Sequence, residues 1–250
     1  MDIETYAERH PQLASDEVEA HLLEWIERTD FSTMLDVGCG SGRLITALAS
    51  MGLLDHVSVH GVDLSQSRID MFHERMPEVH LAVDDAESLR TVPDHTIDFL
   101  VSTQVLEHVD DIQMLAAVRR VLAPGGVAYI STVFKRPWAR FFWRSQSGAW
   151  SLDPTHLREY TDDAQLLGLC YPMGPMLIDS RKVPVRFPVL DFVIRRLRLE
   201  PERIFASRIG RLARRVRIQI PGYFTWSLVL RATESYEGHA SAGSSATTSR

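Results

Sequence analysis

The sequence contains 250 residues, of which 45% are hydrophobic and 24% charged, and its formal net charge is −6. This composition is typical of a globular protein with one medium-sized domain or at most two small ones. No apolar run reaches the about 18 residues of a transmembrane helix, and the acidic N-terminus does not predict a signal peptide. Cys39 and Cys170 exclude a disulfide framework, so we expect a cytoplasmic protein.

The charge is unevenly distributed along the chain. Residues 181–217 hold twelve Lys or Arg against three Asp or Glu, so this segment carries +9 and the remainder −15. A basic segment on an acidic body indicates contact with an anionic surface, an anionic substrate or an acidic part of the same protein.

Residues 1–30 predict a helical lead-in. An apolar stripe at helical spacing follows Ser15 and Asp16, either of which is a candidate N-cap. The stripe consists of Val18, Leu22, Trp25 and Ile26. We expect it to pack against the core.

A glycine-rich turn follows the first predicted strand, residues 34–37. The pattern is Asp-x-Gly-x-Gly-x-Gly, and a helical pattern begins after it. Glycine permits unusual dihedrals, and a ligand at this turn meets bare backbone N–H groups at a helix start. The dinucleotide fingerprint needs a glycine where this chain has Arg43. The pattern instead resembles motif I of the class I S-adenosylmethionine-dependent methyltransferases. The resemblance implies cofactor contacts at Asp36, Gly38, Cys39, Gly40 and Gly42.

Acidic residues follow the next two predicted strands. The strand at residues 57–63 ends in Asp63, which would bind ribose hydroxyls or cap the following helix. Leu64, beside it, is included in the predicted cofactor site. After the strand at 79–83, the resemblance implies that Asp85 and Ala86 contact the adenine amino group. The alternative is a solvated acidic turn, and Asp84 is difficult to tell from Asp85.

The fourth predicted strand, residues 96–102, leads into the sequence TQVLEHV. This stretch is similar to the fourth-strand motif of the ubiquinone/menaquinone-type small-molecule methyltransferases. The resemblance implies that it lines the methionine end of the cofactor and the substrate entrance, with Gln104 as the methionine contact. Glu107 or His108 then faces the substrate or holds the loop.

The order of elements predicts the fold. Asp110 or Asp111 caps a helix to Leu122, and a Pro-Gly-Gly turn precedes a fifth strand at 127–133. This alternation predicts a doubly wound, mostly parallel α/β sheet with helices on both faces, and the resemblance implies the seven-stranded Rossmann-like methyltransferase fold. Ligands bind outside the carboxyl ends of such strands, where all the predicted cofactor residues fall, so we expect one crevice.

Basic and aromatic side chains alternate in residues 135–144. They would enclose an apolar or planar acceptor, contact a membrane interface, stack on nucleic acid, or pack as an ordinary helix with solvated arginines. The acidic body argues against nucleic acid.

His156 is the preferred candidate for a catalytic base. The segment THLREYT resembles a His-containing turn of ubiquinone-type O-methyltransferases. A group that titrates near neutrality can take the proton of an acceptor hydroxyl. His108 and Tyr160 are rivals, and the alternative is that His156 and Asp153 cap the helix that begins near Thr161.

The C-terminal part predicts a helix at 161–169, a strand at 176–181 and a last strand at 223–231, antiparallel in the family. Between these strands, an arginine-flanked apolar stripe that starts at Pro201 predicts a helix. This helix would contact an anionic membrane through residues 195–217, cover an anionic acceptor or pack on the domain. The predicted domains are a lead-in (1–30), a methyltransferase domain (31–233) with substrate-cap segments (135–160 and 182–220), and a disordered tail (234–250).

The sequence therefore predicts an S-adenosyl-L-methionine-dependent enzyme that methylates a small, lipophilic or anionic molecule. The sequence lacks the motif of enzymes that methylate amino groups and the Pro-Cys nucleophile of covalent catalysis. It also lacks Cys/His residues at the spacing of a zinc site and a clear acidic triad for Mg²⁺. We therefore expect no metal, and a direct displacement with general-base assistance. O-methylation is preferred. C-methylation of a quinone-like or polyketide ring, a non-catalytic cofactor-binding protein and a nicotinamide oxidoreductase are the alternatives.

Overall fold

The computed structural model describes residues 18–141, 143–144, 148–170, 176–190, 212–213 and 216–233. The tail expected at 234–250 lies outside these residues. Residues 1–17, the larger part of the predicted lead-in with its candidate caps Ser15 and Asp16, also lie outside them. The same holds for nearly all of the helix expected from Pro201.

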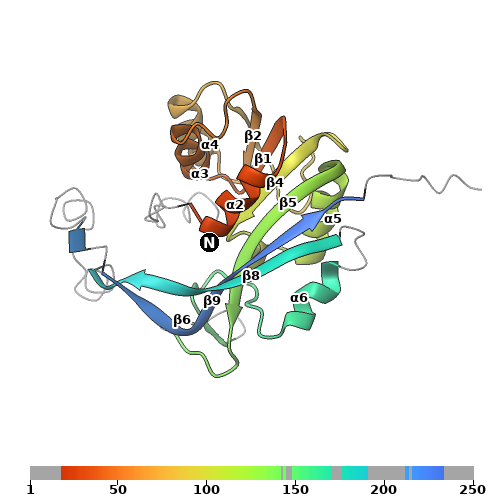
Figure 1. Ribbon diagram of the computed structural model, residues 1–250. Coiled ribbons are helices and arrows are strands. Elements are labelled where there is room, and N and C mark those ends of the chain that lie inside the picture. Colours follow the sequence, from red (N-terminus) through yellow and green to blue (C-terminus); the bar gives the residue numbers. More distant parts are fainter. Residues whose placement is uncertain are drawn as a thin grey trace, which may run out of the picture.

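One seven-stranded sheet forms the centre of the molecule, in the order β3-β2-β1-β4-β5-β9-β8 (Figure 1). Its strands are β1 (Thr33–Val37), β2 (Ser58–Asp63), β3 (His80–Val83), β4 (Ile97–Thr103), β5 (Leu122–Lys135), β8 (Met176–Pro188) and β9 (Arg217–Arg231). The pairings among the first five strands are parallel, and β9 runs antiparallel to both β5 and β8. This confirms the predicted fold class. Two short strands, β6 (Trp143–Arg144) and β7 (Trp150–Ser151), pair separately.

Helices cover both faces of the sheet. They are α2 (Ala20–Arg28), α3 (Arg43–Ser50), α4 (Gln66–Arg75), α5 (Asp111–Val121) and α6 (Asp163–Cys170), with a 3₁₀ turn, η1 (Leu106–His108). Neighbouring residues of one strand face opposite ways, so Phe99 packs in the cluster under α2, α3 and α4, and Leu100 in the cluster under α5 and α6. The two hydrophobic clusters thus lie on opposite faces of the sheet.

Two of the helix starts have a side-chain cap: Asp110 caps α5, as one of the two predicted candidates, and α4 is capped by Ser65 and not by Asp63. The Ser65 hydroxyl accepts a hydrogen bond from the backbone N–H of Arg68 at the start of α4, and the Asp110 carboxylate accepts one from Gln113 at the start of α5. The N-cap of α2 is instead Glu19, whose side chain makes no capping bond.

The outer strands are longer than predicted. β5 begins at Leu122, and β8 and β9 extend to Pro188 and from Arg217, so parts of the cap segment 182–220 are antiparallel strand (Figure 1). Apolar residues alternate with other residues along this part of β8, which is the two-residue period of a strand with one covered face. Val185 and Phe187 pack against Ile220 and Tyr223 in a small third cluster.

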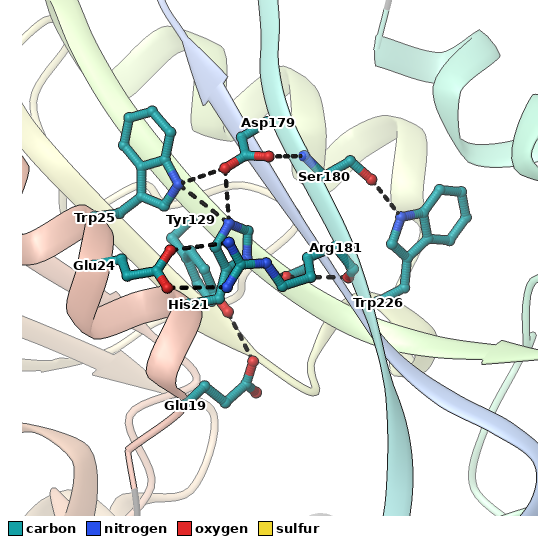
Figure 2. A network of polar contacts seen from close by, with 10 residues as sticks. Glu19, His21, Glu24, Trp25, Tyr129, Asp179, Ser180, Arg181 and Trp226 are labelled. Atoms are coloured by element: carbon teal, nitrogen blue, oxygen red, sulfur yellow. Dashed lines mark hydrogen bonds and ion pairs between the residues drawn. The ribbon is translucent and has the colours of Figure 1, made fainter.

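A buried polar network fastens α2 to the sheet (Figure 2). His21 lies between the Ser227 hydroxyl, 2.5 Å from Nδ1, and the Asp179 carboxylate, 3.0 Å from Nε2. The Trp25 indole N–H also donates to Asp179, at 3.1 Å. The predicted apolar stripe is buried as expected, but the network beside it has no signal in the sequence.

Glu19 connects the start of α2 to β5. Its carboxylate accepts hydrogen bonds from the Tyr129 hydroxyl at 2.7 Å and the Ser131 hydroxyl at 3.1 Å. Since Ser131 pairs with Thr103 near the carboxyl ends of β5 and β4, this contact fixes α2 close to the expected crevice.

Candidate functional site

The glycine loop between β1 and α3 has the backbone that its sequence indicates. Gly38, Gly40 and Gly42 all have positive φ angles, of 76°, 54° and 78°. A Cβ atom at Gly38 would lie 2.4 Å from the Val105 side chain, and one at Gly42 would lie 2.1 Å from the Phe72 ring. Only glycine fits these positions, so the loop presents bare backbone at the carboxyl end of β1.

The loop is fixed to the end of β2. The backbone N–H groups of Gly38 and Cys39 donate to the Val62 carbonyl at 2.8 and 3.0 Å. The Asp63 carboxylate accepts hydrogen bonds from Gly40 and Ser65, both at 2.9 Å. Because Ser65 caps α4, Asp63 does not cap this helix. It joins the glycine loop to the helix start. Each Asp63 oxygen keeps a second acceptor site for a ligand hydroxyl.

Two carboxyl groups lie under the loop. Asp36 is buried at the end of β1, and burial raises its pKa to about 7, with the neighbouring charge of Asp63 adding to the shift. Burial also raises the pKa of the Cys39 thiol well above its usual range. Leu64, beside Asp63, is exposed at the rim.

The structure distinguishes the two acids after β3. Asp84 holds the turn, because its carboxylate accepts from both the backbone and the hydroxyl of Thr91. Asp85 accepts from Glu87 N–H through Oδ1, and its Oδ2 has no hydrogen-bond partner within the described chain. Asp85 therefore has the oxygen that a ligand could use, and Ala86 beside it is buried.

Gln104 occupies a left-handed backbone conformation after β4, with φ of 58°. Its N–H donates to the Ser131 carbonyl at 2.9 Å, and the next residue, Val105, is the side chain that contacts Gly38. A non-glycine residue at positive φ is uncommon, and surrounding contacts must maintain it. Its side chain is exposed at the carboxyl edge of the sheet.

Glu107, His108 and His156 gather next to this turn. One candidate ligand atom from each lies within 4.8 Å of those of the other two, and the two imidazole rings are edge to face with centroids 4.8 Å apart. Two imidazoles and a carboxylate can accept and donate a proton or bind a divalent metal.

Hydrogen bonds orient both histidines. His156 Nδ1 lies 2.8 Å from Glu159 Oε1, and Lys135 forms an ion pair with Glu159 at 3.0 Å. His108 Nδ1 lies 3.2 Å from the Thr155 hydroxyl. Burial of Glu159 opposes its ionisation, but the hydrogen bond from His156 and further donors hold its pKa below the usual range. Neither Glu159 nor Lys135 is predicted as a site residue from the sequence, where the available signal for Glu159 is the His-x-x-Glu spacing from residue 156.

Glu107 is fully buried. Its Oε2 accepts from the Thr132 hydroxyl at 2.8 Å, whereas its Oε1 has no hydrogen-bond partner among the described residues. Burial raises the pKa of Glu107 to about 6 despite the nearby His156.

Tyr160 does not join this cluster. Its ring is buried in the core, its hydroxyl donates to Asp111 at 2.7 Å, and burial raises its pKa above the usual range. Asp153 accepts hydrogen bonds from Thr155, which precedes His156, so the expected helix cap near Thr161 is not the role of either residue. Tyr160 is therefore a structural residue, and the two histidines remain the candidates.

The comparison of sequences identifies a family domain. Residues 35–130 match the family model described as methyltransferase domain. The chain is similar to a ubiquinone biosynthesis O-methyltransferase of Pseudomonas paraeruginosa, with 33% identity over 128 residues, 48% of this chain and 53% of the relative. The chain thus spans about half the length of the curated relatives that it matches.

Solved structures share the fold. A methyltransferase from Methanosarcina mazei, described as SAM-dependent, is 18% identical over 88% of this chain and 100% of its own, with a TM-score of 0.58. A geranyl diphosphate C-methyltransferase from Streptomyces coelicolor, in complex with S-adenosyl-L-homocysteine, is 15% identical over 86% of this chain and 81% of its own, with a TM-score of 0.55. The matched domain, the glycine loop and the sheet order show that residues 35–130 form a class I S-adenosylmethionine-dependent methyltransferase domain, whose cofactor is S-adenosyl-L-methionine.

Proposed function

We propose that the protein transfers the methyl group of S-adenosyl-L-methionine to an oxygen atom of a small acceptor molecule. The observation that carries this proposal is the cluster of Glu107, His108 and His156 beside the Gln104 turn. An oxygen nucleophile must lose a proton as it attacks, and imidazole and carboxylate groups can accept this proton. The similarity to an enzyme named as an O-methyltransferase supports the same assignment.

The cofactor site follows from the carboxyl ends of the strands. The glycine loop at 36–42 holds the amino acid part, Asp63 with Leu64 the ribose, and Asp85 with Ala86 the adenine. Gln104 lies at the methionine end. The positive φ angles of the loop glycines and the unpartnered Asp85 Oδ2 support this arrangement.

The cluster supplies the proton chemistry of the transfer. With Nδ1 directed at Glu159, His156 has Nε2 available to take the acceptor's proton. Lys135 balances the charge of Glu159 as the imidazolium forms. The cofactor supplies an electrophilic methyl group on a sulfonium, and the protein aligns the acceptor oxygen with it.

The test is a panel of phenols, catechols, carboxylic acids and activated ring carbons, incubated with methyl-labelled cofactor. We expect an O-linked methyl product, found by mass spectrometry and fragmentation. His156→Ala should lower turnover by about 10²–10⁴-fold, the usual contribution of a general base, while calorimetry still detects S-adenosylhomocysteine binding. Asp63→Ala should lose that binding. A product methylated at carbon would favour the alternative, C-methylation.

We further propose that the arm formed by the ends of β8 and β9 contacts an anionic membrane from which a lipophilic acceptor enters. Large apolar side chains are exposed here and in the adjoining residues 138–143. They are Trp138, Trp143, Val183, Leu212, Val216 and Ile218. The +9 charge of residues 181–217 suits anionic headgroups.

A further inference from the structure

A pocket lies at the amino ends of the first four strands, away from the cofactor crevice at their carboxyl ends. Thr33, His80 and Ile97, which begin β1, β3 and β4, all line it. Its volume of about 380 Å³ lies within the about 300–1,000 Å³ usual for sites that bind small molecules. The proposed function makes no use of this pocket.

The pocket results from the form of the crossover between β3 and β4. The structure describes all of this crossover, residues 84–96, and it contains turns and no helix. The crossovers after β1, β2 and β4 contain α3, α4 and α5. A helix would cover the apolar face of the strands beneath it, whereas these turns leave a space between crossover and sheet.

Most of the lining is apolar. Leu35, Val62 and Ile97 line the pocket from the strands, and Val92 and Pro93 line it from the crossover. Aliphatic side chains and a proline ring favour a ligand that buries apolar surface against them.

Two histidines supply the polar part of the lining. His60 on β2 is half-buried and His80 on β3 is exposed, and their rings stack with centroids 4.9 Å apart and 29° between the planes. The Ser58 hydroxyl lies 3.2 Å from His60 Nε2. Burial and the neighbouring His80 lower the pKa of His60, because a second positive charge beside it is unfavourable. A negatively charged ligand would offset this repulsion.

The histidine pair lacks the counter-charge that the fold gives to its buried histidines. His21 pairs with Asp179, and His156 pairs with Glu159. Within the described part of the chain, neither His60 nor His80 forms an ion pair with a carboxylate. The carboxylate of a ligand would supply this charge and accept a hydrogen bond from an N–H group of each ring.

One lining residue connects the pocket to the cofactor crevice. The backbone N–H and the hydroxyl of Thr91 both donate to Asp84 Oδ2, at 2.7 and 2.6 Å. Asp84 donates its own N–H to the Asp63 carbonyl at 3.1 Å, and Asp85 follows it in the chain. A ligand against Thr91 would therefore order the turn between the proposed ribose and adenine contacts.

We propose that this pocket is a second ligand site, which binds a small planar aromatic carboxylate and communicates through Thr91 with the cofactor crevice. The carboxylate lies at His60 and His80, and the aromatic ring lies between the sheet and Pro93. A flat ring packs well against the faces of the imidazoles. The communication, unlike the pocket itself, rests on the proposed cofactor contacts.

The test uses 2-naphthoate as the probe. The full chain is saturated with S-adenosylhomocysteine, which fills the cofactor part of the crevice, and is titrated with 2-naphthoate by calorimetry. We expect one equivalent to bind. His60→Ala and His80→Ala should each weaken binding by about 10-fold or more, as expected for a lost hydrogen bond to a charged group. Ala82→Leu, which adds volume to the lining, should abolish binding.

Three controls identify the site and the chemistry that it recognises. His73→Ala removes an exposed histidine of α4 that does not line the pocket, and it should leave binding unchanged. A probe held in the acceptor site would lose affinity in His156→Ala and retain it in His80→Ala, which would overturn the proposal. 2-Naphthamide has the same ring without the charge and should bind about 10-fold more weakly. Equal binding of the amide and the acid would also overturn it.

The last measurement separates the pocket from the methyl transfer. S-adenosylhomocysteine binding shows that each variant is folded, and the exposed position of His80 keeps that variant informative if His60→Ala does not fold. 2-Naphthoate should tighten S-adenosylhomocysteine binding by about 5-fold, and the reverse effect must be equal. An unchanged affinity would overturn the communication through Thr91. Binding of 2-naphthoate at this pocket by a protein that forms no O-methyl product would reject the proposed function and retain the site.

Discussion

At the scale of single residues, the close approach of backbone to neighbouring side chains determines the conformation of the glycine loop between β1 and α3. Gly42 has φ of 78° and the Phe72 ring against its Cα, whereas Gly125, in the turn before the main part of β5, has φ of 77° and open space around it. Both positions have a positive φ angle, but only Gly42 has a side chain packed against it. They form a matched pair for mutation.

We expect Gly125→Ala to lower the free energy of unfolding by about 1–2 kcal/mol, the cost of a left-handed non-glycine residue. Gly42→Ala adds a Cβ that would lie 2.1 Å from the Phe72 ring, so it should cost more and also weaken S-adenosylhomocysteine binding. Urea unfolding and calorimetry measure both quantities. Equal effects of the two substitutions would show that backbone conformation alone, and not close packing, explains the glycine.

Asp36 gives the folded protein a specific pH dependence. It ionises near pH 3.9 in an unfolded chain and, because burial raises its pKa, near pH 7 in the folded protein. Between these values the folded state binds more protons, so this group lowers the free energy of unfolding as pH rises from about 4 to 7, with little change above.

Asp36→Asn should remove this loss. Relative to the parent protein, the variant is expected to gain stability from pH 4 to pH 8, by a few kcal/mol at most at about 1.4 kcal/mol per pKa unit. Denaturant unfolding at several pH values gives the difference. A difference that is constant with pH would mean that Asp36 is ionised throughout, with its charge compensated.

At the scale of elements, α2 depends on polar contacts as well as on its apolar stripe. His21 is buried between Ser227 and Asp179, and its hydrogen bond is the main reason why the pKa of Asp179 lies below its usual range (Figure 2). These partners come from β9 and β8, so a single side chain on α2 joins three elements.

His21→Ala should lower the free energy of unfolding by about 1–3 kcal/mol, because it leaves buried partners without a hydrogen bond. Amide exchange in α2 should accelerate more than in β4. Glu24→Ala is the control, since the exposed Glu24–Arg181 ion pair lies on the same helix and contributes little. If the two variants were equally stable, the buried network would not be what holds α2.

At the scale of the whole molecule, exposed apolar side chains lie along the ends of β8 and β9 and beside them, next to the segment that carries the basic charge in the sequence. No helix in the described part of the chain is long and apolar enough to cross a membrane. The arm of β8 and β9 extends away from the sheet (Figure 1), and Trp138, 65% exposed, lies beside β9 at Gly222.

We expect the protein to bind vesicles that contain phosphatidylglycerol and not to bind vesicles of phosphatidylcholine alone. Binding should weaken as salt rises, because charges near the surface are screened. Trp138→Ser should reduce it severalfold, while Ile112→Ser, at another exposed apolar position, on α5, should not. Flotation assays measure the bound fraction, and equal binding to neutral vesicles would contradict the proposed contact.

The sequence by itself determined the fold and the backbone features of the proposed cofactor site. The spacing of Gly38, Gly40 and Gly42, and acids at the ends of successive strands, are local features. Each is readable because the physical demand, a positive φ or a strand end, falls on a residue and its immediate neighbours. The capping role of Asp110 was readable for the same reason.

Only the tertiary structure decided the roles of the remaining polar residues. Asp84 and Asp85 are alike in sequence, and contact with Thr91 separates them. Tyr160 resembled a catalytic candidate until its hydroxyl was found against Asp111. The joining of Glu107 to His156, and of His21 to Asp179, depends on segments distant in the chain meeting across the fold. Such contacts leave no local pattern, because their partners are set by how the helices and strands pack.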